Sequence, residues 1–123
     1  MEAMVTVTDE KYFIGTKLLI YSFLKHHPNY QGEIVVIHDH LPQHYRDELS
    51  SFYAIQFEHV SERLQTKLEA LVSALPHFKN ELQRFWSVEL FRLTSYQKIL
   101  FLDSDILCRG NLKSLLITRR FIF

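Results

Sequence analysis

The chain has 123 residues, 47% of them hydrophobic and 23% charged, which is typical of a globular domain and excludes a disordered chain. Its 14 basic and 14 acidic side chains cancel, so no large basic field is available to hold nucleic acid without specific contacts. The single cysteine, Cys108, excludes an internal disulfide and a multi-cysteine zinc site.

The first elements predicted along the chain are a strand and a helix. We predict the strand over residues 4–8 and the helix over residues 12–25, with the carboxylate of Asp9 as a cap before it. The helix carries further apolar residues beside its regular apolar stripe, so we expect it to be covered on more than one side. The residues of that stripe, at helical spacing, are Ile14, Leu18, Tyr21 and Leu24.

Two more strands follow, separated by a short helix. Residues 33–38 contain Ile-Val-Val-Ile, a β-branched run that suits a strand buried on both faces of a parallel sheet. Pro42 suits the first turn of a helix that runs to about residue 52. Residues 55–59 are a weaker strand candidate.

The second half of the chain predicts two amphipathic helices and a last strand. Leucines over residues 64–75 mark the first helix, which ends near Pro76, and residues 80–94 form the second. Phe85, Trp86 and Phe91 on the second helix are core candidates. Residues 98–102 form the last strand.

This order of elements predicts an α/β fold. Strands that alternate with helices favour a mostly parallel sheet with helices on both faces. Ligands of such sheets bind at the carboxyl ends of the strands. The candidate functional residues should therefore be sought where the predicted strands end.

Asp103 and Asp105 follow the last predicted strand directly, separated only by Ser104. Ionised carboxylates at the end of a buried strand need a cation as a partner. Oxygen ligands at this spacing suit Mn²⁺ or Mg²⁺, and a metal held there would stabilise a nucleotide diphosphate as a leaving group. The alternative is that the two aspartates only cap the following turn, because aspartate favours such positions.

The residues around this motif carry a resemblance to a known family. Residues 93–107 combine an aromatic residue and a lysine, an apolar strand, Asp-x-Asp and another apolar pair, and residues 109–116 follow as a short turn into a helix. Residues 5–12 are similar to an opening strand and loop, and residues 19–25 to the helix after it. In this order, and over nearly the whole chain, they resemble glycosyltransferase family eight, whose members have the GT-A (Rossmann-like) fold.

The resemblance implies roles for particular residues. Asp103 and Asp105 would be the metal ligands, and Asp103 would also lie near the ribose of the nucleotide. Tyr12 would stack on the uracil, although a tyrosine at a helix start is more often a packing residue. Arg84 stands one helical turn before Ser87, where relatives have a lysine that contacts the donor; its alternative is a solvated surface arginine. Backbone groups at the end of the first strand would read the uracil. The residues expected to bind the nucleotide are Thr6, Val7, Thr8, Tyr12, Arg84, Asp103 and Ser104.

The implied activity is transfer of a hexose from a UDP-sugar, dependent on Mn²⁺ or Mg²⁺, with retention at the anomeric carbon. The acceptor, which the sequence does not identify, would be a saccharide, a lipid-linked glycan or a protein. Members of the family continue past the Asp-x-Asp strand into an acceptor-binding half with a histidine ligand. We therefore expect residues 1–116 to be the sugar-nucleotide-binding part of a truncated GT-A domain and residues 117–123 a tail at the truncation point.

Truncation leaves a second interpretation open. The chain would then be an inactive remnant, or a module that binds nucleotide or metal without transferase activity, and its exposed edge would favour self-association. No catalytic residue is predicted, because the region that would face the donor sugar is absent. The chain has neither a signal-peptide pattern nor an apolar run of about 18 residues, so we expect a cytoplasmic protein, with peripheral membrane attachment left open.

Two other chemistries fit parts of the sequence. His38, Asp39 and His40, with His44 nearby, suit a zinc or di-metal centre, although a polar loop at the sheet edge explains them as well. Phosphatases of the haloacid-dehalogenase type also use Asp-x-Asp after a strand. They have a threonine where this chain has Leu107, and their motif follows the first strand of the domain.

Overall fold

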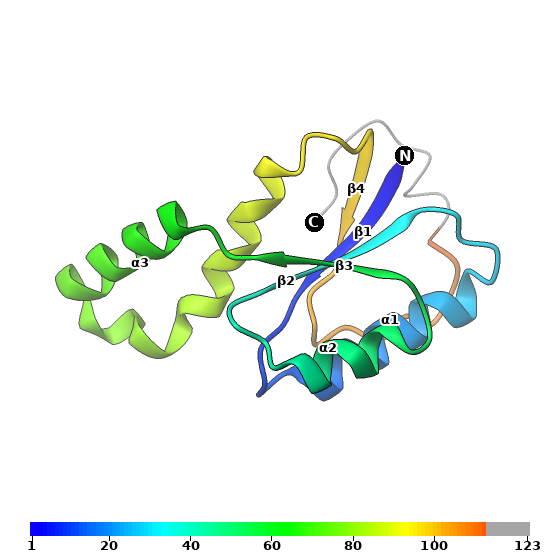
Figure 1. The fold of residues 1–123 in the computed structure, drawn as a ribbon, viewed down its shortest axis with the longest axis horizontal. Coiled ribbons are helices and arrows are strands. Elements are labelled where there is room, and N and C mark those ends of the chain that lie inside the picture. Colours follow the sequence, from blue (N-terminus) through cyan, green and yellow to red (C-terminus); the bar gives the residue numbers. More distant parts are fainter. Residues whose placement is uncertain (113–123) are drawn as a thin grey trace.

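Four parallel strands form a single sheet in the order β3-β2-β1-β4 in the computed structural model, which describes residues 1–112 (Figure 1). The predicted tail at residues 117–123 lies outside the described residues. Both β2 and β3 have the predicted bounds, and all neighbouring strands pair in parallel as expected. The strands are β1 (Glu2–Val7), β2 (Glu33–His38), β3 (Ile55–His59) and β4 (Lys98–Phe101).

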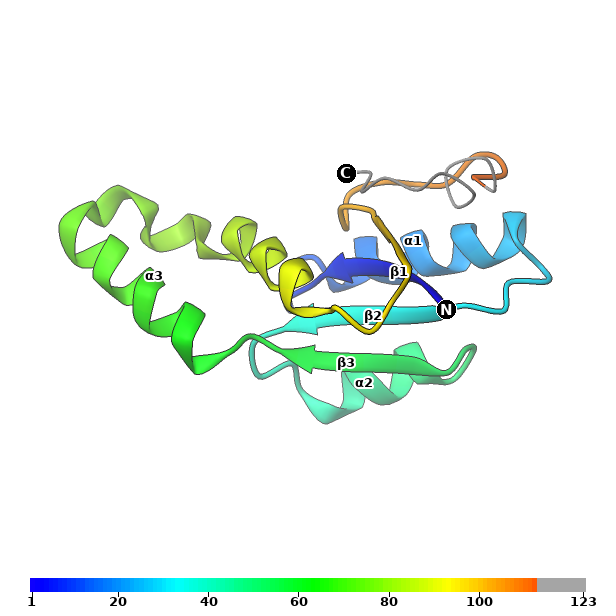
Figure 2. The same ribbon diagram turned by 90° about the horizontal axis from the view of Figure 1, so that it is seen from above.

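The helices connect these strands in alternation, as predicted. They are α1 (Phe13–His26), α2 (Gln43–Ser50), α3 (Glu62–Ala74) and η1 (Pro76–Arg92), of which η1 has 3₁₀ geometry. The predicted break between α3 and the next helix is almost absent, because η1 begins at Pro76 directly after α3. Figure 2 shows α3 projecting beyond the sheet and η1 running back to it. No helix within residues 1–112 is long and apolar enough to cross a membrane.

Helical segments cover both faces of the sheet, as the sequence predicts. Alternate residues of a strand point to opposite faces, so Met4 packs in one cluster and Val5 in another. The cluster that contains Met4 includes Phe23 of α1 and Leu49 of α2, and also the buried Cys108. The cluster that contains Val5 includes Leu90 of η1. The sheet therefore has α1 and α2 on one face and η1 on the other.

Of the apolar stripe predicted on α1, only Leu24 packs against the core. Ile14 is 66% exposed, Leu18 52% and Tyr21 62%, so the expectation that α1 is covered on more than one side is wrong for the described residues. The helix packs on the sheet by one face only, and apolar periodicity cannot decide between two stripes on one helix. The buried residues of α1 are Phe13, Thr16, Leu19, Ile20, Ser22 and Phe23.

The core assignment of Phe91 is also wrong, because its side chain is 63% exposed. With about three residues per turn, successive side chains of a 3₁₀ segment are about 120° apart. Leu90 occupies the core position, and its neighbour Phe91 is consequently turned away from it. Trp86 is partly buried against the same cluster as Leu90, in agreement with its prediction.

A buried carboxylate links η1 to the start of α3. The side chain of Glu89 is 4% exposed and accepts hydrogen bonds from Ser61 N at 3.2 Å and from Ser61 Oγ at 2.7 Å. It also pairs with Arg92 on the next turn. Burial alone would raise the pKa of Glu89, but the hydrogen bonds from Ser61 and Arg92 together hold this pKa below its ordinary value. The ionised form of Glu89 therefore stabilises the fold.

We expect Glu89→Gln to lower the free energy of unfolding by about 1.5–3 kcal/mol at pH 7, the range for hydrogen bonds to charged groups. Because the folded-state pKa of Glu89 is depressed, its contribution is present above the unfolded-state pKa of about 4.3 and is lost as the pH falls through the folded-state value. Urea unfolding of both proteins between neutral and acidic pH measures this difference.

Glu48→Gln is the matched control, because Glu48 forms an exposed ion pair with Lys17 at 3.0 Å. Such pairs contribute about 0–1 kcal/mol. Equal losses in the two variants, or a Glu89→Gln loss that does not shrink at acidic pH, would contradict the assignment.

Candidate functional site

The ends of β1 and β4 create a crevice at one edge of the sheet. The two strands are neighbours, with Val5 opposite Phe101, and Leu102 N donates a hydrogen bond to Val5 O at 3.0 Å. The segment that follows Val7 at the end of β1 therefore lies directly beside the segment that follows β4. The segment after β1 leads into α1 on one face of the sheet, whereas η1, which precedes β4, lies on the other face. A parallel sheet opens a binding crevice where its connections diverge in this way.

A pocket of about 420 Å³ occupies this crevice. Its volume lies within the range of small-molecule sites, about 300–1,000 Å³. One wall comes from the end of β1 and the segment before α1, a second from η1, and a third from the turn after β4. The lining residues are Val7, Asp9, Lys11, Tyr12, Asn80, Glu81, Gln83, Arg84, Ser87, Phe101, Asp103, Ser104 and Asp105.

Six of the residues that the sequence singled out line this pocket together. They come from segments far apart in the chain, and the pairing of β1 with β4 is what brings the two ends into one place. These residues are Val7, Tyr12, Arg84, Asp103, Ser104 and Asp105.

Thr6 and Thr8 do not line the pocket, because both are fully buried. Thr8 N donates to Ile37 O at 2.9 Å, and the Thr8 hydroxyl accepts from Thr16 Oγ1 of α1 at 2.7 Å. The Thr6 hydroxyl has no hydrogen-bond partner within residues 1–112. In this structure both side chains support the end of β1 from behind the pocket wall.

The Asp103–Ser104–Asp105 turn has two exposed carboxylates, one of which also caps the turn. Asp103 Oδ1 accepts from Ser104 N at 2.9 Å, and Ile106 N donates to Asp103 O at 3.1 Å. Asp103 thus shapes the turn as the capping interpretation of the motif requires. Both aspartates are nevertheless exposed in the pocket lining, while Ser104 between them is buried. The turn presents carboxylate oxygens to the pocket as well as capping itself.

Helix α1 approaches this turn so closely that only glycine fits at the contact. A Cβ atom on Gly15 would lie 2.5 Å from the Ser104 carbonyl oxygen. Real Cβ atoms do not approach a backbone oxygen to this distance. Glycine is an unfavourable residue inside a helix, by about 1 kcal/mol relative to alanine. At Gly15 the close packing of α1 against the Asp103–Asp105 turn requires it.

The pocket lining carries four carboxylates and two cations. Arg84 pairs with Glu81 at 3.3 Å, and Lys11 Nζ lies 5.4 Å from the centre of the Tyr12 ring. Within residues 1–112, no cationic side chain forms an ion pair with Asp103 or Asp105. Two carboxylates without a cationic partner are suitable ligands for a hard divalent cation, so the donor set fits Mn²⁺ or Mg²⁺.

Several lining residues were not predicted from the sequence. Asp9 and Lys11 lie between predicted positions, and Asp9 Oδ1 accepts from Tyr12 N at 2.8 Å, which fixes the approach to α1. The η1 residues could not be found by periodicity, because nothing in the local pattern indicates which turn of a helix lies above a neighbouring strand end. Ser87 also lines the pocket, and the sequence had named it only as the position where relatives have a lysine; its Oγ donates to Arg84 O at 3.3 Å. The lining residues that were not predicted are Asp9, Lys11, Asn80, Glu81, Gln83 and Phe101.

Comparisons with known proteins agree with this fold. The sequence profile of glycosyl transferase family 8 matches residues 3–120. The galactosyltransferase LgtC, in a structure with donor and acceptor sugar analogs, superposes with a TM-score of 0.74 at 18% identity, over 94% of this chain and 42% of that one. An active-site mutant of LgtC gives a TM-score of 0.75 at 19% identity over the same shares of the two chains.

A third structure, the apo form of the bifunctional glycosyltransferase WbbM, gives a TM-score of 0.58 at 23% identity over 94% of this chain and 20% of that one. The chain therefore spans less than half the length of each of these proteins. A comparison with curated proteins found no match.

We expect Gly15→Ala to destabilise the protein by about 1–3 kcal/mol, the usual cost of adding atoms to a closely packed contact. The loss is the opposite of what alanine normally does inside a helix. Urea unfolding measures it. Gly110→Ala is the control, because a Cβ on Gly110 meets no atom within 4 Å. An unchanged or raised stability of Gly15→Ala would show that α1 does not press on the turn.

Proposed function

The chain belongs to glycosyl transferase family 8, and we propose on that premise that its pocket binds the nucleotide part of a UDP-sugar. The observation that carries the proposal is that Asp103, Asp105 and Tyr12 line one pocket at the ends of β1 and β4. A nucleotide needs both an aromatic surface for its base and a means of holding its phosphates. These three residues offer the two chemistries from two segments of the chain that line a single pocket.

The charge of the pocket supports a metal-dependent mode of binding. Carboxylates outnumber cations in the lining, so a diphosphate anion that entered without a counterion would be repelled. We infer that Asp103 and Asp105 hold Mn²⁺ or Mg²⁺ together with the diphosphate. Such a cation, when bound, supplies Lewis-acid stabilisation of the nucleotide diphosphate as it leaves the sugar.

The remaining lining residues bind and orient the donor in this proposal. Tyr12 is 40% exposed, so its ring is available for stacking on the uracil. The Arg84 side chain is 64% exposed and forms an ion pair with Glu81. In the proposal it leaves Glu81 when the donor binds and pairs with a phosphate oxygen instead. An arginine is suited to this exchange because its guanidinium recognises carboxylate and phosphate by the same paired hydrogen bonds.

The full reaction proposed is transfer of a hexose to an acceptor with retention at the anomeric carbon. The acceptor is a saccharide, a lipid-linked glycan or a protein. Family membership supports this reaction, and the proposal assigns the pocket residues to binding of its donor. None of the pocket residues is assigned a part in bond making or bond breaking.

We expect calorimetric titration of the chain with UDP to give heat of binding with Mn²⁺ present and none without it. Asp105→Ala should abolish this metal-dependent binding and leave the fold intact, because the side chain is exposed and makes no ion pair within the described residues. Circular dichroism checks the fold of the variant.

Asp47→Ala is the control for the loss of an exposed aspartate, since Asp47 lies on α2 and does not line the pocket. It should bind UDP as the unchanged chain does. Equal UDP affinity of Asp105→Ala and the unchanged chain would remove Asp105 from the site. Equal UDP affinity with and without Mn²⁺ would remove the metal from the proposal.

We expect Arg84→Gln to weaken Mn²⁺-dependent UDP binding by about 1.5–3 kcal/mol, or roughly 10–150-fold, because one charge-assisted hydrogen bond to phosphate is lost. Arg63→Gln is matched to it as an exposed arginine on α3 that lies outside the pocket lining. The same titration measures both variants. If the two variants bind UDP with equal affinity, Arg84 is a solvated surface residue.

A further inference from the structure

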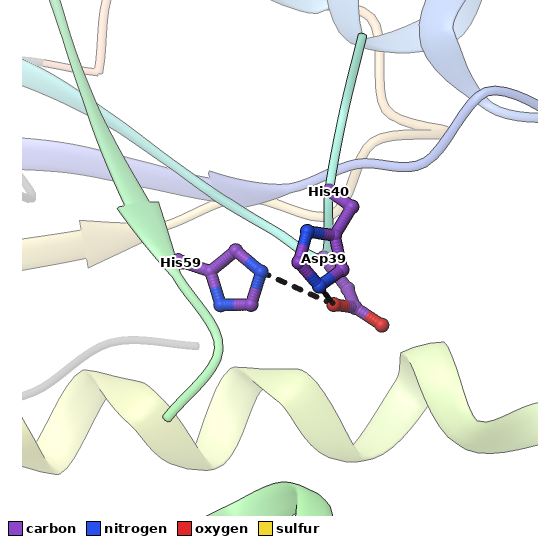
Figure 3. A group of neighbouring side chains, drawn as sticks. All are labelled: Asp39, His40 and His59. Carbon is purple, nitrogen blue, oxygen red and sulfur yellow. Dashed lines mark ion pairs between the residues drawn. The ribbon is translucent and has the colours of Figure 1, made fainter. Parts of the chain in front are cut away.

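A second group of side chains that could bind a metal lies at the ends of β2 and β3, which β1 separates from β4 in the sheet. Asp39 and His40 follow β2, and His59 ends β3 (Figure 3). Their ligand atoms all lie within 4.8 Å of one another, and none of the three residues lines the pocket described above. We propose that Asp39, His40 and His59 form a zinc site.

The hydrogen bonds of His59 leave one lone pair directed at a carboxylate. His59 Nδ1 lies 2.7 Å from the Val60 carbonyl oxygen, which can only accept, so Nδ1 carries the hydrogen. In the neutral ring Nε2 is then unprotonated, yet it faces Asp39 Oδ1 at 3.2 Å. Two lone pairs at this distance repel each other unless a cation lies between them. A proton on Nε2 or a metal ion satisfies both atoms.

The separations of the ligand atoms match a tetrahedral metal. Asp39 Oδ1 lies 3.2 Å from His59 Nε2 and 3.6 Å from His40 Nε2. Zinc binds nitrogen and oxygen at about 2.0–2.1 Å in tetrahedral geometry, which places neighbouring ligand atoms about 3.4 Å apart. The two distances from Asp39 Oδ1 lie on either side of this value, and the ligand atoms of all three residues lie within 4.8 Å of one another. The cluster is therefore close to the size that a tetrahedral Zn²⁺ requires.

Outer hydrogen bonds orient two of the three ligands. The Val60 carbonyl fixes the His59 ring, and Gln65 Nε2 donates to Asp39 Oδ1 at 2.9 Å. Metal-binding histidines and carboxylates in proteins are held by such partners, which fix the tautomer and the direction of the ligand. Arg92, a cation near His59, is paired with Glu58 and Glu89, so its charge is balanced by two carboxylates.

The backbone of His40 contributes to the cluster. It is the only non-glycine residue of the described chain with a positive φ, 53°. The turn after β2 places the His40 ring beside that of His59, with ring centres 4.4 Å apart. The zinc alternative raised from the sequence paired His40 with His38, but His38 is buried and its Nδ1 accepts from Leu41 N at 3.1 Å. The second imidazole of the proposed site comes instead from His59, which no local motif indicates.

The ligand types separate this site from the one proposed for Mn²⁺ or Mg²⁺. Two imidazole nitrogens favour zinc over hard cations, whereas Asp103 and Asp105 offer oxygen only. The His40 side chain is 83% exposed, so the fourth tetrahedral position opens to solvent and takes water or a small anionic ligand. Each cation can therefore be titrated at its own site.

The test is calorimetric titration of the 123-residue chain with Zn²⁺, followed by Co²⁺ as a spectroscopic probe. We expect one strongly bound Zn²⁺ per chain and intense visible absorption of tetrahedral Co²⁺ that Zn²⁺ displaces. His59→Asn and His40→Asn should each weaken Zn²⁺ binding by more than the roughly 10–100-fold caused by loss of an outer partner. Asparagine at position 40 tolerates the positive φ, so the turn is preserved.

Two controls make the result specific. His44→Asn removes an exposed histidine outside the cluster and should leave Zn²⁺ affinity unchanged. Asp103→Asn should remove Mn²⁺-dependent UDP binding and leave Zn²⁺ binding intact, so failure of one site is distinguishable from failure of the other. Weak octahedral Co²⁺ spectra in the unchanged chain, or equal Zn²⁺ affinity in all four variants, would overturn the proposal.

Discussion

β1 is the strand on which the described structure depends, because it pairs with β2 on one side and β4 on the other. Both neighbours run parallel to it, so their carboxyl ends meet at the same edge of the sheet. β4 is separated from β1 by some 90 residues of chain in the sequence, and only the sheet register brings Asp103 beside Val7. The pocket lies at the ends of β1 and β4, and the Asp39–His40–His59 cluster lies at the ends of β2 and β3. Both therefore lie at the same edge of the sheet.

The two proposed metal sites differ because of the side chains that each strand end supplies. The turn after β4 offers carboxylates to a pocket whose charge is already negative, and a hard cation that is shared with a phosphate group suits it. The ends of β2 and β3 offer imidazole nitrogens and one carboxylate, a set that needs no phosphate to complete it. In this proposal each site selects its metal by the type of ligand atom that it offers.

The sequence predicts the strands better than the faces of the helices. The Ile-Val-Val-Ile run predicted β2 with its bounds, since β-branched residues buried on both faces leave few other structures open. α1 is different, because Ile14 and Phe13 belong to two apolar stripes and only the tertiary packing selects between them. The Asp103–Asp105 turn was found because the motif is local. Asn80, Gln83 and His59 were not, because their roles come from neighbours that the fold supplies.

The shape of η1 affects how tightly any ligand of the pocket is held. Its buried residues, Glu89 and Leu90, lie at the end nearest the sheet, whereas its pocket-lining residues lie earlier, along the part that leads out to α3. Local unfolding is easiest where few apolar contacts are buried, so this outer part opens at a lower free energy than the strands do. A ligand that contacts it must restrict that motion and loses part of its binding energy as conformational entropy. The order of η1 therefore contributes to affinity at this pocket, in addition to the chemistry of the residues it carries.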